Sequence, residues 1–158
     1  MALNAFLKLK GEKQGEIKGG VTQKGREGSI LVNAANHELA VPRDITSGLP
    51  TGRVMHKPFV ITKLLDKSSP LLYQALINNE NITEWLLQFW ATAVNGIEKQ
   101  EYAVKLGNAR ITDIRFVMPN NKVPELAKLN EYEEVEFVYQ SIEWTWTDGG
   151  ITASGKWE

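Results

Sequence analysis

Apolar and polar side chains alternate along residues 132–146, and the phase of the alternation changes midway. The apolar residues carry odd numbers in the first half and even numbers in the second: Val135, Phe137 and Tyr139, then Ile142, Trp144 and Trp146. Successive strand residues point to opposite faces, so a slip of one residue turns core side chains outward unless the chain bends or bulges. We therefore predict one very long strand, bent near Gln140 and Ser141, that is shared between two sheets or wraps round a barrel.

The overall composition is that of an ordinary globular protein. The chain has 158 residues, 42% of them hydrophobic and 23% charged, which suits a single domain spanning residues 1–158. Its formal net charge of −1 gives no general attraction to polyanions, so we expect no nucleic-acid partner and no binding to an anionic membrane. No segment approaches the roughly 18 apolar residues of a membrane span, so we expect no direct membrane insertion.

The first ten residues lack the basic region, apolar core and small-residue cleavage site of a secretory signal peptide. We therefore expect a cytoplasmic protein that, if it leaves the cell, leaves without a cleavable N-terminal signal. The chain contains no cysteine, which excludes disulfide bonds, thiolate metal sites and cysteine nucleophiles.

Several further segments have the alternation or the apolar content of strands: residues 3–10, 29–37, 59–64, 97–106 and 109–118, and a final short strand ending at Trp157. Residues 82–94 fit either a helix or a strand, and the Asn95-Gly96 pair after them is a strong hairpin signal. Residues 38–57 contain several Pro and Gly and show little periodicity, and residues 119–130 form a second loop. Because unstructured loops as long as residues 38–57 tend to be functional or disordered, we expect a long extended loop there.

One helix is well marked. Ser68 or Ser69 can cap its first turn, Pro70 fits that turn, and Asn78-Asn79 tolerates the left-handed stop. The apolar stripe between these signals consists of Leu71, Leu72, Ala75 and Leu76. Together the elements predict a mainly antiparallel β-barrel or sandwich with a single α-helix.

Few residues offer catalytic or metal-binding chemistry. His37 and His56 are the only imidazoles, and Glu38 and Asp44 are the only acids near them, so solvated loop histidines are favoured over a metal site. Residues 11–20 are rich in glycine but lack the Gly-Lys-Ser/Thr ending of a phosphate loop. We therefore expect no catalytic residue, no metal and no cofactor.

Two groups of side chains leave alternatives open. Glu134 and Glu136 share a strand face and would suit the paired carboxylates of a glycoside hydrolase, although a solvated face is the favoured interpretation. Trp144 and Trp146, with Trp85 and Trp90, would either line a ligand pocket or fill a core or a subunit interface. Aromatic residues with a period of two favour the core or the interface.

Charge is unevenly distributed along the chain. Residues 1–28 carry six Lys or Arg against three acids, whereas residues 125–143 carry six acids against Lys128. Opposite signs at the two ends could pair within one subunit or between neighbouring copies. Head-to-tail contacts between copies close into a ring or continue as a filament. A long strand with an uncovered edge favours the same outcome.

Five segments, taken in order along nearly the whole chain, resemble one known family. They are Ala5-Phe6-Leu7-Lys8-Leu9, Glu16-Ile17-Lys18-Gly19-Gly20, Phe59-Val60-Ile61-Thr62-Lys63, Asp66-Lys67-Ser68-Ser69-Pro70-Leu71-Leu72, and Tyr132 to Tyr139 running into Ile142 to Trp146. The Asp-x-x-Ser-Pro-Leu entry to the helix and the aromatic strand are the more specific of these. The chain resembles the Hcp family, the haemolysin-coregulated tube protein of bacterial type VI secretion.

The resemblance implies a β-barrel of two antiparallel sheets beside one helix, with a long extended loop, assembled as a homohexameric ring. Such rings stack into a hollow tube inside a contractile sheath and below a spike protein, and some members hold secreted effectors in the lumen. The tube protein is itself exported in the process, which explains the expected lack of a signal peptide and of catalytic residues. Tail tubes of contractile phages have a similar design.

The resemblance also suggests roles for particular residues. The loop at residues 41–57 would reach adjacent subunits or rings through the polar residues Arg43, Asp44, Arg53 and His56, the alternative being a mobile surface loop. Trp144 and Trp146 are candidates for the subunit interface, the alternative being an intramolecular core. Asn33, Ala35 and His37 share a parity and are candidates for the lumen wall.

Three other functions stay open at this point. The first is a monomeric β-barrel that binds a ligand against its tryptophans. The second is a hydrolase that uses Glu134 or Glu136. The third is a phage-like tail tube protein, which would share the ring architecture.

Overall fold

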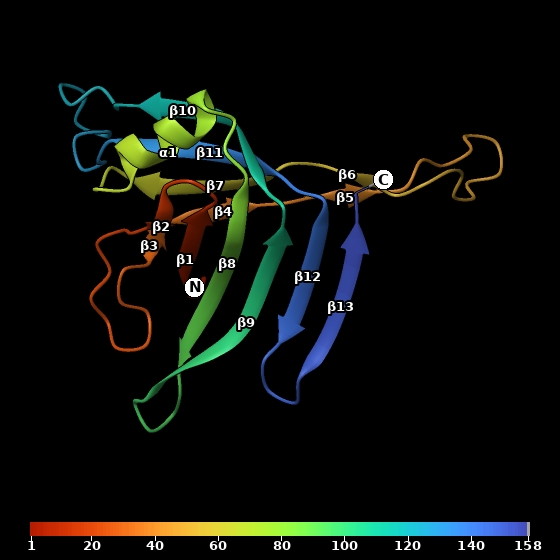
Figure 1. Cartoon of the computed structure of the whole chain (residues 1–158), viewed down its shortest axis with the longest axis horizontal. Helices are drawn as coiled ribbons and strands as arrows, with labels where there is room; N and C mark the ends of the chain where they lie inside the picture. Colours follow the sequence, from red (N-terminus) through yellow and green to blue (C-terminus); the bar gives the residue numbers. More distant parts are fainter. Residues whose placement is uncertain (158) are drawn as a thin grey trace.

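A computed structural model describes residues 1–157, which contain thirteen strands and one helix (Figure 1). The first strands are β1 (Asn4–Gly11), β2 (Gly15–Ile17), β3 (Ile30–Val32), β4 (Ala34–Asn36), β5 (Leu39–Ala40), β6 (Met55–His56) and β7 (Phe59–Leu64). The helix α1 (Ser69–Ile77) is followed by β8 (Ile82–Thr92), β9 (Glu98–Gly107), β10 (Arg110–Val117), β11 (Tyr132–Val138), β12 (Ser141–Trp146) and β13 (Ile151–Lys156).

The strands form two main antiparallel sheets. The larger sheet has the order β13-β12-β9-β8-β1-β2, and β3 also pairs with β1. The smaller sheet has the order β10-β11-β7-β4, and the two short strands β5 and β6 form a separate ribbon. The prediction of a mainly β, two-sheet fold with one helix is confirmed, and residues 82–92 prove to be a strand.

Within the described residues the chain passes from one sheet to the other through α1, between β7 and β8, and at three sharp corners. They lie at Asn33 between β3 and β4, at residues 108–109 between β9 and β10, and at residues 139–140 between β11 and β12. The predicted bend at Gln140 and Ser141 is therefore confirmed, and the strand is shared between the sheets as expected. The single strand predicted over residues 29–37 is wrong, because the corner at Asn33 divides it into two short strands in different sheets.

Hydrogen bonds join two of the corners directly. The Gln140 amide donates to the Gly107 carbonyl at 3.0 Å, and Asn108 Nδ2 donates to Gln140 Oε1 at 2.9 Å. Asn108 has a positive φ of 48°, a conformation that asparagine tolerates better than most residues. The Trp157 amide donates to the Gln140 carbonyl at 2.9 Å, so the C-terminal strand is tied to the same corner.

The core lies between the two sheets and is centred on Trp85. The Trp85 ring is fully buried and meets Phe59 and Phe137 edge to face, with ring centroids 5.0 and 5.5 Å apart. Trp90 instead lies outside this core, where the Arg26 guanidinium sits 4.1 Å from its ring centroid. Of the tryptophans considered for a ligand pocket, Trp85 is thus a core residue.

The helix lies beside the smaller sheet and buries Leu72 and Ala75. Its predicted end is confirmed, since Asn79 adopts a positive φ of 48°. The predicted side-chain cap is wrong for Ser68, whose hydroxyl bonds to Asp66 and makes no capping bond to the helix. Ser69 is the first helical residue, and its hydroxyl donates to the buried carboxylate of Glu133 at 2.7 Å.

A buried ion pair connects the smaller sheet to the start of this helix. Lys63 on β7 and Glu133 on β11 face each other in the sheet and are both fully buried, with 3.0 Å between Nζ and Oε1. Lys63 Nζ also donates to Ser69 Oγ and to the Leu64 carbonyl, each at 3.0 Å, and lies 3.1 Å from Asp66 Oδ1. A buried charge is tolerated when it is paired and hydrogen-bonded in this way.

We expect Glu133→Ala to lower the free energy of unfolding by about 3–5 kcal/mol, because it leaves the Lys63 ammonium buried without its main partner. Chemical denaturation measures this loss. The neighbouring residue gives a matched control: Glu134 bonds to Arg115 at the surface, at 3.3 Å, and Glu134→Ala should cost less than about 1 kcal/mol. Equal losses in the two variants would contradict the structural role of the buried pair.

Candidate assembly surfaces

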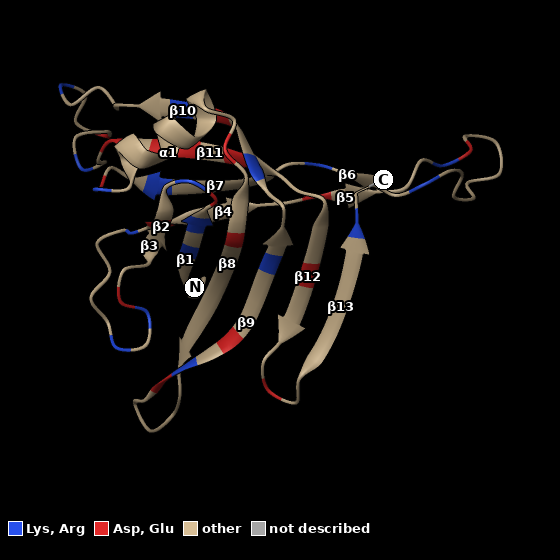
Figure 2. Ribbon diagram, in the orientation of Figure 1, with Lys and Arg blue, Asp and Glu red and all other residues tan. Residues whose placement is uncertain are grey.

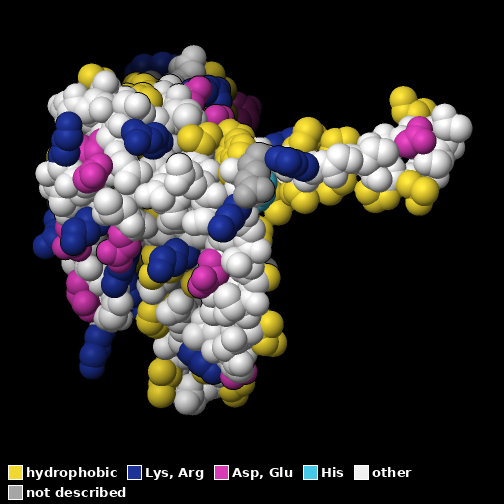
Figure 3. All heavy atoms as spheres, turned by 45° about the vertical axis from the view of Figure 1, so that its right-hand side comes forward, with side chains coloured by type: hydrophobic (Ala, Val, Ile, Leu, Met, Phe, Trp, Pro, Cys, Tyr) yellow, Lys and Arg dark blue, Asp and Glu magenta, His cyan; other side chains and the backbone are white. Residues whose placement is uncertain are grey.

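Residues 38–57 form an arm that extends well beyond the barrel (Figures 1 and 3). Its root is the ribbon of β5 and β6, and farther out Thr51 N donates to the Pro42 carbonyl at 2.6 Å. Exposed apolar side chains follow the arm on both sides of its tip: Val41, Ile45, Leu49, Val54 and Met55. The long loop predicted here is therefore a defined hairpin whose apolar side chains its own barrel does not cover.

The tip of the arm is organised by Asp44. Its carboxylate accepts hydrogen bonds from the Thr46 amide and the Ser47 hydroxyl, both at 3.0 Å, and its carbonyl accepts one from the Gly48 amide at 2.7 Å. The bond from the Thr46 amide, followed by that from Ser47, lowers the pKa of the Asp44 carboxyl below its ordinary value of 3.8. Asp44 thus has a local role in the turn, in addition to any contact it makes with another subunit.

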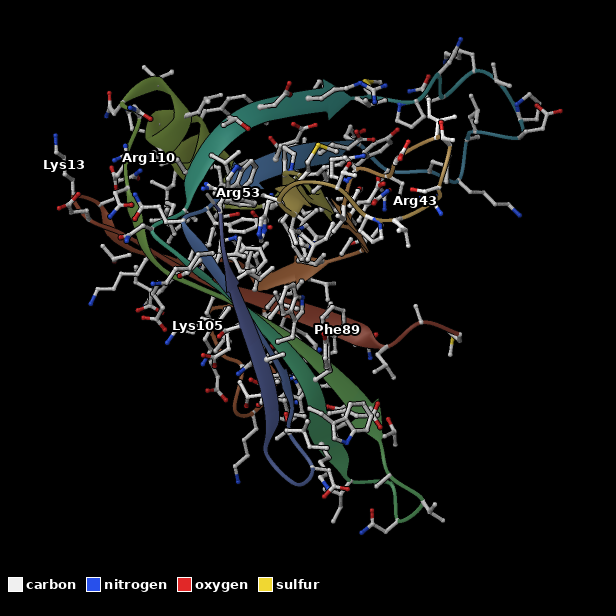
Figure 4. The ribbon with its side chains drawn as sticks, turned by 90° about the vertical axis from the view of Figure 1, so that its right-hand side faces the viewer. Lys13, Arg43, Arg53, Phe89, Lys105 and Arg110 are labelled. Carbon is white, nitrogen blue, oxygen red and sulfur yellow. The ribbon has the colours of Figure 1, made fainter. Side chains whose placement is uncertain are left out.

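The polar residues predicted for the arm do not form one cluster. Arg43 and Asp44 lie near the tip, Arg53 lies on the returning segment, and His56 lies at the root on β6. Figure 4 shows Arg43 and Arg53 apart from one another, and neither forms an ion pair with another of residues 1–157. The two guanidinium groups are therefore available for contacts outside the subunit.

The root of the arm holds a cluster that the sequence patterns did not reveal. His37 Nε2 and His56 Nδ1 lie 2.9 and 2.8 Å from the same atom, the hydroxyl oxygen of Tyr139. His37 stacks on Phe59 and His56 on Trp157, with ring centroids 5.0 and 5.8 Å apart. The only hint in the sequence was the position of Tyr139, immediately before the expected bend.

Burial changes the acid–base properties of this cluster. It raises the pKa of the Tyr139 phenol to about 12, so the hydroxyl keeps its proton throughout the physiological range. The pKa of His37 is lowered from its usual 6.5, first by burial and second by the nearby His56, while a backbone hydrogen bond at Lys57 acts in the opposite direction. These histidines are not the solvated loop residues that the sequence favoured.

A second apolar surface lies on the inner face of the larger sheet. Trp144 is opposite Val104, and Trp146 is opposite Tyr102, which is itself opposite Phe89. Because Val104 belongs to the core, all these side chains lie on the inner face. We call Phe89, Tyr102, Trp144 and Trp146 the inner patch.

The smaller sheet covers only part of that inner face. In Figure 1 the lower halves of β8, β9, β12 and β13 continue past it, and in Figure 4 Phe89 lies in this lower region. Trp144 is half-buried against the core, whereas Trp146 is 42% exposed. A cavity of about 400 Å³, lined in part by Phe89, Tyr102 and Trp144, opens where the smaller sheet ends.

Of the lumen candidates, Ala35 lies on β4 on the core-facing side of the smaller sheet, Asn33 lies at the corner before β4, and His37 follows β4; Asn33 and Ala35 are exposed and His37 is half-buried. Ala35 is opposite the buried Ile61, and all three residues line the cavity of about 400 Å³. The prediction that they face a lumen concerns an assembly of several copies, and it stays a prediction. Within one subunit, His37 instead meets Tyr139.

The remaining candidates for chemistry lie at the surface of the barrel. Glu134 and Glu136 are on one face of β11, opposite Thr62 and Val60, and Glu134 is paired with Arg115. Basic and acidic residues are interspersed over both sheets (Figure 2). Within residues 1–157 no group of three or more His, Asp or Glu side chains is arranged to hold a metal ion. Over the same residues, the structure has no helix long and apolar enough to cross a membrane.

Comparisons with known proteins point to one family. The family model described as "Type VI secretion system effector, Hcp" matches residues 6–146. The "Major exported protein" of Pseudomonas aeruginosa is 39% identical over 99% of this chain and 96% of its own length. A crystal structure of an Hcp protein is 33% identical, with a TM-score of 0.91 and 99% of both chains covered. The Hcp1 protein of E. coli EAEC 042 is 34% identical, with a TM-score of 0.88 over 99% of this chain and 100% of that one.

The hydrogen bonds at the arm tip give a prediction for Asp44. Asp44→Ala should speed hydrogen exchange at the Thr46 amide several-fold, whereas Asp44→Asn, which keeps an acceptor oxygen, should stay close to the original rate. Because the pKa of Asp44 is lowered, its contribution to tip order is present above pH 3.8 and is lost as the pH falls through the lowered pKa. NMR exchange measurements test both points. Unchanged exchange in Asp44→Ala would show that the carboxylate does not organise the tip.

Proposed function

Because this chain belongs to the Hcp family of type VI secretion proteins, we propose that it is the tube subunit of such a system, a single domain over residues 1–158. Six copies form a ring, the rings stack into a hollow tube, and the tube lies inside a contractile sheath below a spike protein. The subunit is exported with the tube, as the name "Major exported protein" suggests for its Pseudomonas aeruginosa relative. Effectors carried in the lumen are its cargo, and the subunit acts as a structural part without catalysis.

The observation that carries this proposal furthest is the arm. The apolar side chains of this hairpin project from the barrel: Ile45 is fully exposed and Leu49 is 65% exposed. In a monomer these side chains stay in water and do not contribute to stability. Contact with an adjacent subunit or ring would bury these residues. Arg43, Arg53 and the remaining polar groups of the arm would then set the register between stacked rings.

The inner patch and the outer edge of β13 are proposed as the lateral contacts of the ring. The edge of β13 is unpaired in the described chain, and the single charge on this strand, Lys156 at its end, gives it little protection against pairing with another strand. Ile151 at its start and Trp146 opposite are 68% and 42% exposed. A repeated lateral contact of this kind joins two different surfaces and closes into a ring. Asn33, Ala35 and His37 remain the proposed lumen residues.

The first prediction from this function is a mass. Native mass spectrometry should find a species six times the 17.7 kDa chain, and Trp146→Arg should reduce its fraction because a charge would be buried at an apolar contact. Ile77→Arg is the matched control, since Ile77 is 76% exposed at the end of α1, away from the proposed contacts. A wild-type monomer at all concentrations would overturn the ring and favour the ligand-binding barrel. A normal hexamer in Trp146→Arg would remove only the inner patch from the interface.

The second prediction separates the arm from the ring. Deleting residues 48–53 should leave hexamers intact but weaken stacking into tubes and export, because the arm loses Leu49 and Arg53 while the ribbon of β5 and β6 remains. Electron microscopy of the purified protein and a secretion assay measure the two effects. Replacing residues 48–53 by an equally long Gly/Ser segment tests whether side chains or length matter. Normal export of the deletion variant would refute the role of the arm tip.

A further inference from the structure

The two histidines at the root of the arm contact the same hydroxyl group of the barrel. His37 precedes β5, His56 ends β6, and Tyr139 occupies the corner between β11 and β12. The two imidazoles therefore lie where the outgoing and the returning segments of the arm join the barrel. Both ring nitrogens lie 2.8–2.9 Å from Tyr139 Oη. Figure 1 shows this root beside the C-terminal end of the chain. We call His37, Tyr139 and His56 the latch.

Tyr139 of the latch is buried, whereas His37 and His56 are half-buried and each stacks on an aromatic ring. Tyr139 is only 4% exposed and meets Trp157 edge to face, with centroids 5.0 Å apart. His37 lies against Phe59 and His56 against Trp157. Both imidazoles contact Tyr139 at the root of the arm, so their protonation state bears directly on how the arm is held.

The number of protons decides whether these hydrogen bonds can all form. A phenol has one proton to donate, and a neutral imidazole has one nitrogen that donates and one that accepts. With both histidines neutral, one accepts the Tyr139 proton and the other donates to the Tyr139 oxygen. One proton is accommodated, because the protonated ring donates to the Tyr139 oxygen while the neutral ring accepts the phenolic proton. When both rings are protonated, both can only donate, so the phenolic proton loses its buried acceptor and two cations lie on either side of one oxygen.

We propose that the latch is a proton-sensitive positioning device: neutral histidines hold the root of the arm against the barrel, and protonated histidines release it. This inference goes beyond the tube function and does not depend on it, since it concerns the arm within one subunit. It assigns a positioning role to His56, which belongs to the arm, and to His37 and Tyr139, which lie outside it.

The direction of the effect follows from linkage. The closed latch disfavours protons on His37, whose pKa is lowered from 6.5 by burial and by His56, so the closed state binds fewer protons than the released state. The closed state is therefore fully favoured above pH 6.5 and loses stability as the pH falls below this value. Opening that is coupled to one proton grows by up to about tenfold for each pH unit between pH 6.5 and the lowered pKa of His37, and levels off below that pKa.

The surrounding charges offer the histidines little compensation. Glu38 beside His37 is paired with Lys57 beside His56, at 3.1 Å, so this acid and this base largely cancel. From β13 the nearest charge along the chain is Lys156, which is exposed and positive. On β7, Phe59 is the residue that meets the latch, and Lys63 lies at the other end of that strand with Glu133. On β11, Glu136 is opposite Val60 and next to Phe137, which faces the core. Glu136 therefore points to the opposite face of the sheet.

Hydrogen exchange at the root tests the proposal on the intact protein. The Lys57 amide donates to the Glu38 carbonyl at 3.3 Å and reports closure of the arm, whereas the Gly28 amide, bonded to the Val21 carbonyl at 2.9 Å, is the control. After correction for intrinsic rates, protection of Lys57 should fall by up to about tenfold per pH unit as the pH drops from 6.5 toward the lowered pKa of His37, and that of Gly28 should not. NMR titration of the His37 imidazole should show it taking up its proton over the pH range in which protection of Lys57 falls.

Two variants distinguish a latch from simple packing. His37→Gln combined with His56→Asn keeps an amide near each ring nitrogen that contacts Tyr139, but the amides do not titrate, so protection of Lys57 should become independent of pH. Tyr139→Phe removes the shared oxygen and should lower protection at pH 8 to the level seen at low pH. Light scattering at each pH measures the oligomeric state independently of hydrogen exchange. If the latch proposal fails, the prediction of a hexamer is therefore not affected. Equal protection of Lys57 in the wild-type protein at pH 8 and pH 5 would overturn the proposal, even if neither variant folds.

Discussion

The corner at Tyr139 and Gln140 is the constraint on which much of this structure depends. Here β11 leaves the smaller sheet and continues as β12 in the larger one, so the two sheets share one piece of chain. The backbone of Gln140 bonds to Gly107 and to Trp157, and its side chain bonds to Asn108. One residue earlier, the Tyr139 hydroxyl meets both histidines of the arm root. The corner at residues 108–109, Trp157 and the root of the arm therefore all contact either Tyr139 or Gln140.

The unequal size of the two sheets decides which surfaces the subunit leaves open. Strands β8 and β9 are longer than any strand of the smaller sheet, so their inner faces are only partly covered. The same inner face begins with the fully buried Leu87 and ends with the exposed Trp146 opposite Tyr102. Core and candidate interface are therefore one continuous apolar surface. Every second residue of a strand points to the same face, and this continues beyond the part of the larger sheet that the smaller sheet covers.

Buried charges fix parts of the barrel that apolar packing alone would hold less specifically. Lys63 and Glu133 join two strands to the first residue of the helix. On the other side, the buried Arg26 lies over Phe6 and Trp90 and pairs with Glu98, which ties the segment before β3 to β8 and β9. Hydrogen bonds and ion pairs are directional, so these groups allow few alternative arrangements of the elements that they connect.

The sequence by itself determined the local elements: the alternating strands, the helix between Ser69 and Asn79, the hairpin at Asn95-Gly96 and the bend near Gln140. Each of these leaves a periodic or turn-forming pattern in neighbouring residues. Only the tertiary structure decided that Asn33 is a corner, that Lys63 meets Glu133, and that His37 and His56 share Tyr139. Those contacts join residues up to 102 positions apart, and the pairing of two distant side chains leaves no pattern in the sequence around either of them. The loop histidines therefore seemed solvated until the fold brought the corner and the C-terminal strand against them.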